Sequence, residues 1–392
     1  MKNPFDPFDS NPFVHNPYVR LSSFCHYDET DNQFSDRRKI RKDILSRFLR
    51  GHSNVVLYGP RGYGKSSIAA ELVVDLKKAG IKYMIFDVVK APSLDLFVSS
   101  YAKKVHTEFA PDQSEFSQTG KFLTILKPWY ANLTTEPIVL RMVDDEPISP
   151  EALAEVLDLP QKLLSGKERA VVVFDEFQEL SHLLPNDRFE HVMQSVIRSH
   201  RNVSYLFLGS HYRIVQMFTD PIRPLYKSAE AILLDKPPTE ECIRFVIDRF
   251  ARTGKMIDRI AAENLVARAR NIPCFIQQLG FETFRLVHDK RRKYVWKEDV
   301  ATAAYDLVCF NRNHYEQLML TRSWAQRKLL VALACESPSA FDRGYRRKHA
   351  LGSSSTVSSA CAKLKQDGLI EFSDGYYCIS DPFFAWFLRL EK

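Results

Sequence analysis

Eight consecutive residues, from Gly59 to Ser66, combine glycines, a lysine and a hydroxyl side chain at a spacing that suits phosphate binding. They read Gly-Pro-Arg-Gly-Tyr-Gly-Lys-Ser, which fits the pattern G-x-x-x-x-G-K-[ST]. Glycine allows positive φ and a close approach to phosphate, so successive N–H groups can form an anion cradle. Lys65 would bring charge to the β- and γ-phosphates, and the Ser66 hydroxyl would bind Mg²⁺. The residues predicted to contact the nucleotide here are Gly59, Pro60, Arg61, Gly62, Tyr63, Gly64, Lys65, Ser66 and Ser67.

A pair of acids follows a second apolar stretch. Asp175 and Glu176 come directly after the run Val171–Phe174. An acid at this position can hold Mg²⁺ through water, and its neighbour can polarise the attacking water, so we predict these two roles for Asp175 and Glu176. A strand end with two solvated acids is the alternative. Ser210 ends the next apolar run; it either contacts the γ-phosphate or the lytic water, or caps a helix.

Short apolar runs alternate with helical patterns through the first 236 residues. This alternation predicts an α/β fold with a doubly wound parallel sheet, whose carboxyl ends gather the loops described above. The predicted strands are residues 54–58, 81–89, 170–174, 203–208 and 231–234, and the predicted helices are residues 37–49, 67–78, 94–109, 153–164 and 188–200. Residues 111–165 read as a helical insertion.

The remainder of the chain is mainly helical. Apolar stripes from residue 239 to about 286 predict a small helical lid. A helix at 324–333, a serine-capped helix at 353–367 and a hairpin signal around Ser373-Asp374-Gly375 predict a winged helix. In a DNA reader, serines of the second helix would face the major groove and nearby cations the phosphates, whereas a winged helix that contacts protein stays open. The candidate DNA-binding residues are Arg346, Arg347, Lys348, Ser355, Thr356 and Lys363.

The composition is that of a globular protein with a modest basic excess. Hydrophobic residues make up 45% of the 392 residues and the net charge is +7, which permits nucleic-acid contact without demonstrating it. No apolar run is long enough for a membrane span, and residues 1–20 lack the apolar core of a secretory signal. The seven cysteines form no C-x-x-C pair. We therefore expect a cytoplasmic protein with reduced thiols and no membrane partner.

The first 30 residues are rich in Asn, Pro, Phe and Asp. Asn-Pro-Phe begins at Asn3 and again at Asn11, and Asn-Pro-Tyr begins at Asn16. Since proline blocks helix at these positions, the segment is predicted to be an extended arm whose aromatic residues pack on the domain that follows. A linear docking motif for a partner is the alternative.

Four segments together carry a resemblance to a known family: GPRGYGKSS, VVVFDEFQEL, FLGSHYRIVQMFTDPIRPLYKS and ARNIPCFIQQLG. They resemble the archaeal-type ATPases of the AAA+ superfamily, which are related to origin-recognition initiators and to STAND NTPases. The resemblance covers residues 30–390. It implies that Phe34 and Arg37 line the adenine side, that Ser210 is a sensor, and that Pro273 stands in the turn before the last lid helix. No sensor-2 arginine stands at that turn, which implies either slow hydrolysis or an arginine supplied by another subunit.

These observations predict four parts: an arm at 1–30, an ATPase core at 31–236, a helical lid at 237–310 and a winged helix at 311–392. The predicted function is a slow, Mg²⁺-dependent ATPase that binds ATP and ADP and couples its nucleotide state to double-stranded DNA. A STAND-like signalling ATPase, whose C-terminal domain binds a protein partner or controls homo-oligomer formation, is the alternative. A nucleotide-binding scaffold without turnover is the third hypothesis.

Overall fold

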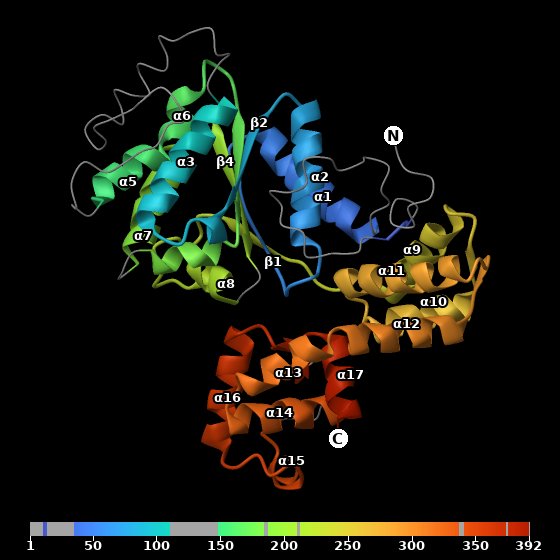
Figure 1. The fold of residues 1–392 in the computed structure, drawn as a ribbon. Helices are drawn as coiled ribbons and strands as arrows, with labels where there is room; N and C mark the ends of the chain where they lie inside the picture. The colour runs from blue at the N-terminus through green and yellow to red at the C-terminus, as the bar shows by residue number, and fades with distance from the viewer. Residues whose placement is uncertain are drawn as a thin grey trace.

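The computed structural model describes residues 11–13, 35–109, 148–183, 187–209, 212–336, 341–373 and 375–391. These residues form a sheet-based core, a group of lid helices and a C-terminal body of helices with a hairpin (Figure 1). Phe34, Ser210 and most of the predicted arm and insertion lie outside the described residues. None of the helices described has both the length and the hydropathy that a membrane crossing requires.

The core contains a five-stranded parallel sheet in the order β2-β3-β4-β1-β5, which confirms the predicted doubly wound fold. Every residue of β3 and β4 is buried, which explains their uninterrupted apolar sequences. Because the strands are parallel, the segments that follow β1, β3 and β4 emerge at one edge of the sheet. The strands are β1 Asn54–Tyr58, β2 Lys82–Asp87, β3 Ala170–Asp175, β4 Val203–Gly209 and β5 Glu230–Leu233.

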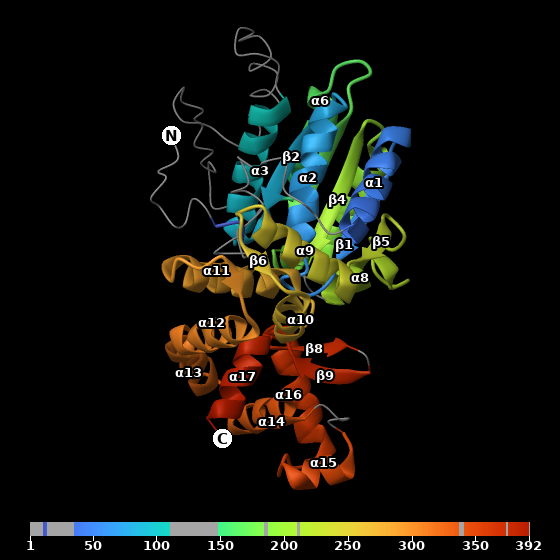
Figure 2. The same ribbon diagram turned by 90° about the vertical axis from the view of Figure 1, so that its right-hand side faces the viewer.

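Helices cover both faces of this sheet (Figures 1 and 2). Alternate strand residues pack to opposite sides: Val173 joins the apolar cluster of α1 and α2, whereas Phe174 joins that of α3, α5, α7 and α8. The helices are α1 Ser35–Arg50, α2 Lys65–Lys78, α3 Leu94–Phe109, α5 Pro150–Leu157, α6 Leu159–Leu163, α7 Arg188–Ser199 and α8 Tyr212–Thr219, with short 3₁₀ turns at η2 Val88–Lys90 and η3 Phe177–His182.

The helix predicted at residues 153–164 was wrong in its extent, because two helices, α5 and α6, occupy this region. They meet at Asp158, and Pro160 stands in the first turn of α6. Proline cannot donate a backbone hydrogen bond and crowds the carbonyl four residues before it, so one continuous helix is disfavoured here.

The lid packs four helices beside the core. Arg270 and Asn271 both take positive φ, of 52° and 60°, and this turn separates the second lid helix from the third. The lid elements are α9 Thr239–Ala251, β6 Met256–Ile257, α10 Arg259–Arg268, α11 Pro273–Asp289, β7 Tyr294–Val295 and α12 Lys297–Phe310.

The C-terminal body contains the predicted helices and hairpin, with a short helix between them and a final helix that packs on the first (Figure 2). Asp381 caps the final helix by accepting from the backbone N–H groups of Phe383 and Phe384, and it also accepts from the Tyr315 hydroxyl. The elements are α13 Arg312–Leu320, α14 Trp324–Cys335, α15 Arg343–Lys348, α16 Ser354–Gln366, β8 Ile370–Ser373, β9 Tyr376–Ile379 and α17 Pro382–Leu390.

Candidate functional site

The glycine-rich loop connects β1 to α2, as the sequence predicted, but its glycines serve different purposes. Gly62 and Gly64 have φ of 82° and 95°, which L side chains rarely adopt. Gly59 does not have positive φ, contrary to expectation. A Cβ at Gly59 would lie 2.4 Å from the carbonyl oxygen of Leu234, so this glycine is required by close packing of two backbone segments.

Lys65 is the first residue of α2 and its ammonium group lies inside the loop that precedes it. Its Nζ donates to the carbonyl oxygens of Gly59, at 2.7 Å, and Pro60, at 2.9 Å. Burial lowers the pKa of Lys65 to about 8, while the carboxylates of Glu176 and Asp175 oppose that change. The ammonium group therefore has neutral acceptors here. A negatively charged phosphate could replace these acceptors and form stronger hydrogen bonds with the ammonium group.

The two predicted metal ligands face each other across the sheet edge. The Ser66 hydroxyl donates to Oδ2 of Asp175 at 3.4 Å, and Asp175 is buried. Burial, with repulsion from Glu176 and Asp87, raises the pKa of the Asp175 carboxyl to about 6. A hydroxyl and a carboxylate oxygen are hard ligands of the kind that Mg²⁺ takes. The residues present therefore fit a magnesium ion.

Glu176 has a backbone conformation that few residues other than glycine adopt, with φ of 54° and ψ of 46°. The side chain of Gln178 donates from Nε2 to Oε2 of Glu176 at 2.5 Å. Gln178 is itself buried against Gly209, where a Cβ would lie 2.5 Å from Gln178 Oε1. The sequence reasoning missed Gln178, although it lies in the acidic strand segment that carries the family resemblance. It holds the side chain predicted to orient the water.

Arg37 and the lid both contact the loop. Nη2 of Arg37 donates to the carbonyl oxygens of Tyr63, at 3.1 Å, and Asp235, at 2.5 Å. Pro273 is the first residue of α11, and the backbone N–H of Cys274 donates to the carbonyl oxygen of Gly62 at 3.1 Å. The glycine-rich loop of residues 59–66, called the phosphate loop below, is thus fixed by α1 on one side and by the lid on the other. Contact of Arg37 and Pro273 with a nucleotide stays a prediction.

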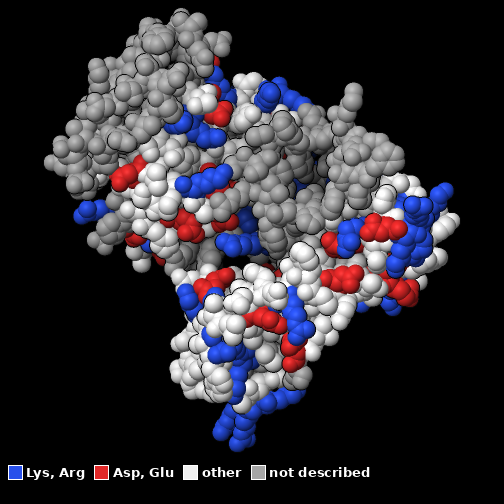
Figure 3. All heavy atoms as spheres, in the orientation of Figure 1, with Lys and Arg blue, Asp and Glu red and all other residues white. Residues whose placement is uncertain are grey.

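The predicted DNA-binding cations gather at the end of the molecule opposite the sheet. Lys and Arg side chains cluster over α15 in Figure 3. Arg347 is exposed, and Lys348 is exposed but forms an ion pair with Glu336 at 2.6 Å. The half-buried Arg346 donates to two backbone carbonyls, those of Phe341 and Gly352.

On α16, the candidate hydroxyl side chains are exposed but are hydrogen-bonded to the N-cap residue, Ser353. Ser355 and Thr356 lie in its first turn, and both hydroxyls lie 2.8 Å from that of Ser353. Lys363 forms an ion pair with Asp367 at 3.1 Å. Several of the candidate residues of α15 and α16 are therefore already paired inside the chain.

A contact that no sequence pattern suggested joins the phosphate loop to the hairpin. The Tyr63 hydroxyl donates to the Glu371 carboxylate in β8, at 3.2 and 3.4 Å to its two oxygens. Lys236 Nζ lies 4.0 Å from the same carboxylate, and Arg270 donates to the carbonyl oxygen of Ile379 in β9 at 2.8 Å. Burial raises the pKa of Glu371. The hairpin is therefore packed against the loop and the lid (Figure 2).

Comparisons with known proteins agree with this architecture. Residues 313–390 match a family model described as a probable winged helix domain. No curated protein is similar to the chain in sequence. A Walker-type ATPase of Pyrococcus abyssi is similar in structure, with a TM-score of 0.64 and 19% identity over 94% of this chain and 99% of that one.

Two proteins of Aeropyrum pernix, ORC1 and ORC2, are also similar in structure. The ORC1 protein, solved in complex with DNA, has a TM-score of 0.51 and 14% identity, over 97% of this chain and 98% of that one. The ADP form of the ORC2 protein has a TM-score of 0.52 and 14% identity, over 95% of this chain and 97% of that one. At these identities the comparison establishes the fold: a P-loop ATPase core followed by a winged helix.

Proposed function

We propose that this protein is a Mg²⁺-dependent ATPase that couples the nucleotide state of its phosphate loop to DNA binding by its winged helix. In this proposal the backbone of residues 59–67, through the N–H groups of its non-proline residues, and the Lys65 ammonium bind the phosphates. Ser66 and Asp175 hold the magnesium ion, which supplies charge neutralisation at the γ-phosphate. Glu176 orients the attacking water, and Gln178 positions Glu176. The hydrogen bond between Ser66 and Asp175 and the burial of Lys65 support these roles.

The observation that carries the coupling is the hydrogen bond from Tyr63 to Glu371. Tyr63 stands between Gly62 and Gly64, whose amides would contact phosphate, so a backbone shift that accommodates a nucleotide also moves the Tyr63 side chain. Tyr63 is 2% exposed and the Glu371 side chain is 11% exposed. Breaking a hydrogen bond to a largely buried carboxylate is costly, so the loop and the hairpin are energetically linked. Such a link is reciprocal: what moves the hairpin must also change nucleotide affinity.

The exposed surface of α15 and α16 supports DNA as the partner. Arg346, Arg347 and Lys348 on α15 and Lys363 on α16 would contact phosphates, and the hydroxyls of Ser355 and Thr356 would face the groove. α15 lies at the end of the C-terminal body that is far from the core, whereas the hairpin lies against the core (Figure 2). The ORC1 protein, which shares the fold, carries DNA in its solved structure.

We keep the division into an arm at 1–30, a core at 31–236, a lid at 237–310 and a winged helix at 311–392 as part of this proposal.

The proposal is tested by measuring DNA affinity and ATP turnover on the same protein. Duplex DNA is titrated without nucleotide, with ADP and with ATP, using Glu176→Gln so that ATP persists during the titration. We expect Glu176→Gln to bind ATP as the wild type does, to lose turnover, and to bind DNA with an affinity that depends on the nucleotide. A wild-type protein without affinity for ATP in the presence of Mg²⁺ contradicts the proposal at its first step.

A STAND-like signalling ATPase is the second candidate, and one observation favours it. Lys348 and Lys363 are already paired with Glu336 and Asp367, so part of the charge offered to DNA is neutralised within the chain. In that case the same titrations give no DNA binding, and ATP instead changes the oligomeric state. Sedimentation of the Glu176→Gln variant with ATP and with ADP separates the two functions.

A further inference from the structure

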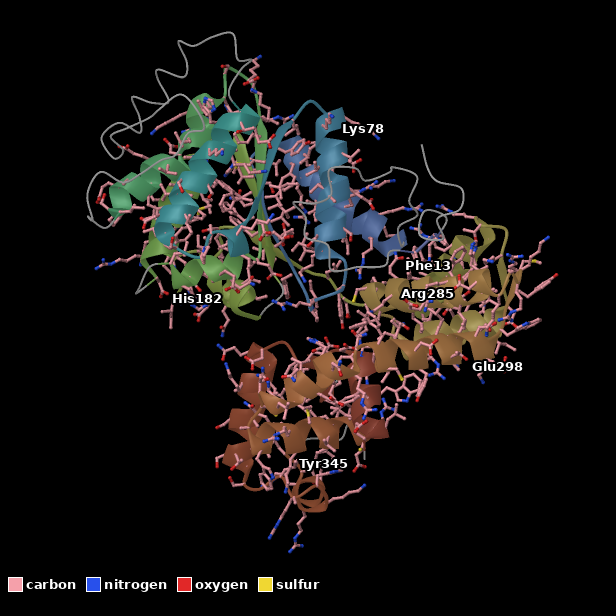
Figure 4. The ribbon with its side chains drawn as sticks, in the orientation of Figure 1. Phe13, Lys78, His182, Arg285, Glu298 and Tyr345 are labelled. Carbon is pink, nitrogen blue, oxygen red and sulfur yellow. The ribbon has the colours of Figure 1, made fainter. Side chains whose placement is uncertain are left out.

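A short segment of the N-terminal arm lies in the lid. Phe13 is only 4% exposed, and its ring packs on that of Phe250 in α9, with ring centroids 5.0 Å apart and planes tilted by 58°. Figure 4 shows Phe13 beside the lid helices. Opposite the ring stands Gly280 in α11, where a Cβ would lie 2.5 Å from two ring carbons of Phe13. The missing side chain at Gly280 therefore leaves the space that the phenyl ring fills.

The polar groups of the same segment are bonded as well. Nδ2 of Asn11 donates to the carbonyl oxygen of Phe281 at 3.2 Å, and its Oδ1 accepts from the backbone N–H of Phe13 at 3.1 Å. Nη1 of the buried Arg249 donates to the carbonyl oxygen of Pro12 at 3.0 Å. Pro12 brings no N–H that would need a partner. Each of the three residues thus has its own contact, which an apolar anchor alone would not require.

We propose that α9 and α11 form a docking site for the tripeptide Asn-Pro-Phe, which we call the Asn-Pro-Phe slot: Arg249, Phe250, Gly280 and Phe281. Residues 11–13 are its tethered occupant, and another segment with this tripeptide can replace them. The sequence supports exchange, since the identical tripeptide stands at residues 3–5 and Asn-Pro-Tyr at residues 16–18. The ligand class is a peptide that carries Asn-Pro-Phe in an extended segment.

Helix α11 connects the slot to the proposed nucleotide site. α11 carries Gly280 and Phe281 in its middle and begins at Pro273, where Cys274 contacts Gly62 of the phosphate loop. A bound tripeptide therefore contacts both α9 and α11, and the first turn of α11 contacts that loop. The docking site itself does not depend on ATP hydrolysis, so it stands or falls separately from the proposed function.

The direct test is binding of a labelled peptide with the sequence of residues 9–15, Asp-Ser-Asn-Pro-Phe-Val-His, measured by fluorescence anisotropy. The protein is the full chain with Phe5→Ala, Phe13→Ala and Tyr18→Ala, so that no aromatic residue of the three repeats competes. We expect saturable binding with a Kd on the order of 100 µM for so small a ligand. The wild type should bind at least about tenfold more weakly, because a tethered occupant has an effective concentration in the millimolar range.

Two controls separate recognition from nonspecific adhesion. Gly280→Ala, added to the triple variant, should abolish binding, because the new methyl group fills the ring's space while alanine favours the helix. A peptide with alanine in place of Asn should bind at least about tenfold more weakly, because it loses both side-chain hydrogen bonds. The proposal is overturned if the triple variant does not bind the peptide, if the wild type binds it equally well, or if the Asn-to-Ala peptide binds as tightly.

A second variant keeps the test decisive if the triple variant does not fold, as judged by circular dichroism. Asn11→Ala with Phe5→Ala leaves the Phe13 ring but removes the amide that donates to Phe281. This chain should bind the peptide at least about threefold more tightly than the wild type, because its own occupant is weakened. Equal binding by the two chains would rule out an exchangeable tripeptide site.

Discussion

The edge of the sheet and the surface of the winged helix differ in how their charges are held. At the sheet edge, Lys65 and Asp175 are buried, and burial shifts both pKa values toward neutrality. On α15 and α16, Lys348 and Lys363 are exposed, and each has an acid of the same chain beside it. A buried charged group has few alternative partners, so its effect depends on where the groups around it lie. An exposed ion pair contributes little to stability and exchanges partners readily. The first region should respond sharply to single substitutions, and the second only to several together.

Lys65→Ala should have the largest effect. Removing a buried ammonium group that would contact phosphate should weaken ATP binding by at least about 100-fold. Fluorescent ATP analogues with Mg²⁺ measure this affinity directly. Lys78→Ala is the matched control, because Lys78 is exposed at the other end of the same helix, far from the loop (Figure 4). Similar affinities for these two variants would contradict the role of the loop.

The triple charge reversal Arg346→Glu, Arg347→Glu and Lys348→Glu tests the exposed region. DNA affinity at low salt should fall by about 100-fold, and the dependence of log K on log salt should become shallower as phosphate contacts are lost. ATP binding should be unchanged, because α15 lies at the far end of the C-terminal body, away from the phosphate loop (Figure 1). A single reversal at Lys348 should have a small effect, because this lysine is already paired with Glu336. An unchanged salt dependence in the triple variant would argue against a DNA-binding face here.

Gln178→Ala tests the side chain that holds the predicted catalytic acid. Losing the bond to Glu176 should lower kcat by about tenfold and leave KM for ATP nearly unchanged, because Gln178 acts on the orientation of the acid and not on nucleotide binding. The control is Gln161→Ala, whose side chain bonds only to backbone N–H groups of residues 201 and 202 among the contacts described. A rise in KM at unchanged kcat would show that Gln178 acts on binding instead.

The sequence predicted the features that depend on consecutive residues and missed those that depend on packing. The strands β1 and β3 and the loop after β1 follow from apolar runs and a motif in consecutive residues. The contact of Tyr63 with Glu371 joins segments 308 residues apart. Gln178 and Glu176 are only two residues apart, but Gln178 is held by burial against Gly209, which no local pattern signals. The arm was predicted to pack through its aromatic residues on the domain that follows, but Phe13, the arm aromatic that the structure describes, packs on the lid helices α9 and α11 instead. The slot that receives it could not be predicted, because it depends on an absent side chain at Gly280.

Tyr63→Phe and Glu371→Gln test the link between the two regions, because they change the contact between the phosphate loop and the hairpin of the winged helix. Each change weakens one hydrogen bond between the phosphate loop and the hairpin, so the difference in DNA affinity between the ATP and ADP states should shrink by about threefold to tenfold. The double variant should shrink it no further, because both changes remove the same contact.

Tyr315→Phe is the matched control, because its hydroxyl also donates to a partly buried carboxylate, that of Asp381, but within the C-terminal body. This variant should be less stable to heat and yet keep the full nucleotide dependence of DNA affinity. If Tyr315→Phe reduced the nucleotide dependence as much as Tyr63→Phe, the effect would belong to the stability of the winged helix in general. If the effects of Tyr63→Phe and Glu371→Gln simply added, the two residues would act on DNA affinity by separate routes, and the contact between them would not be the link.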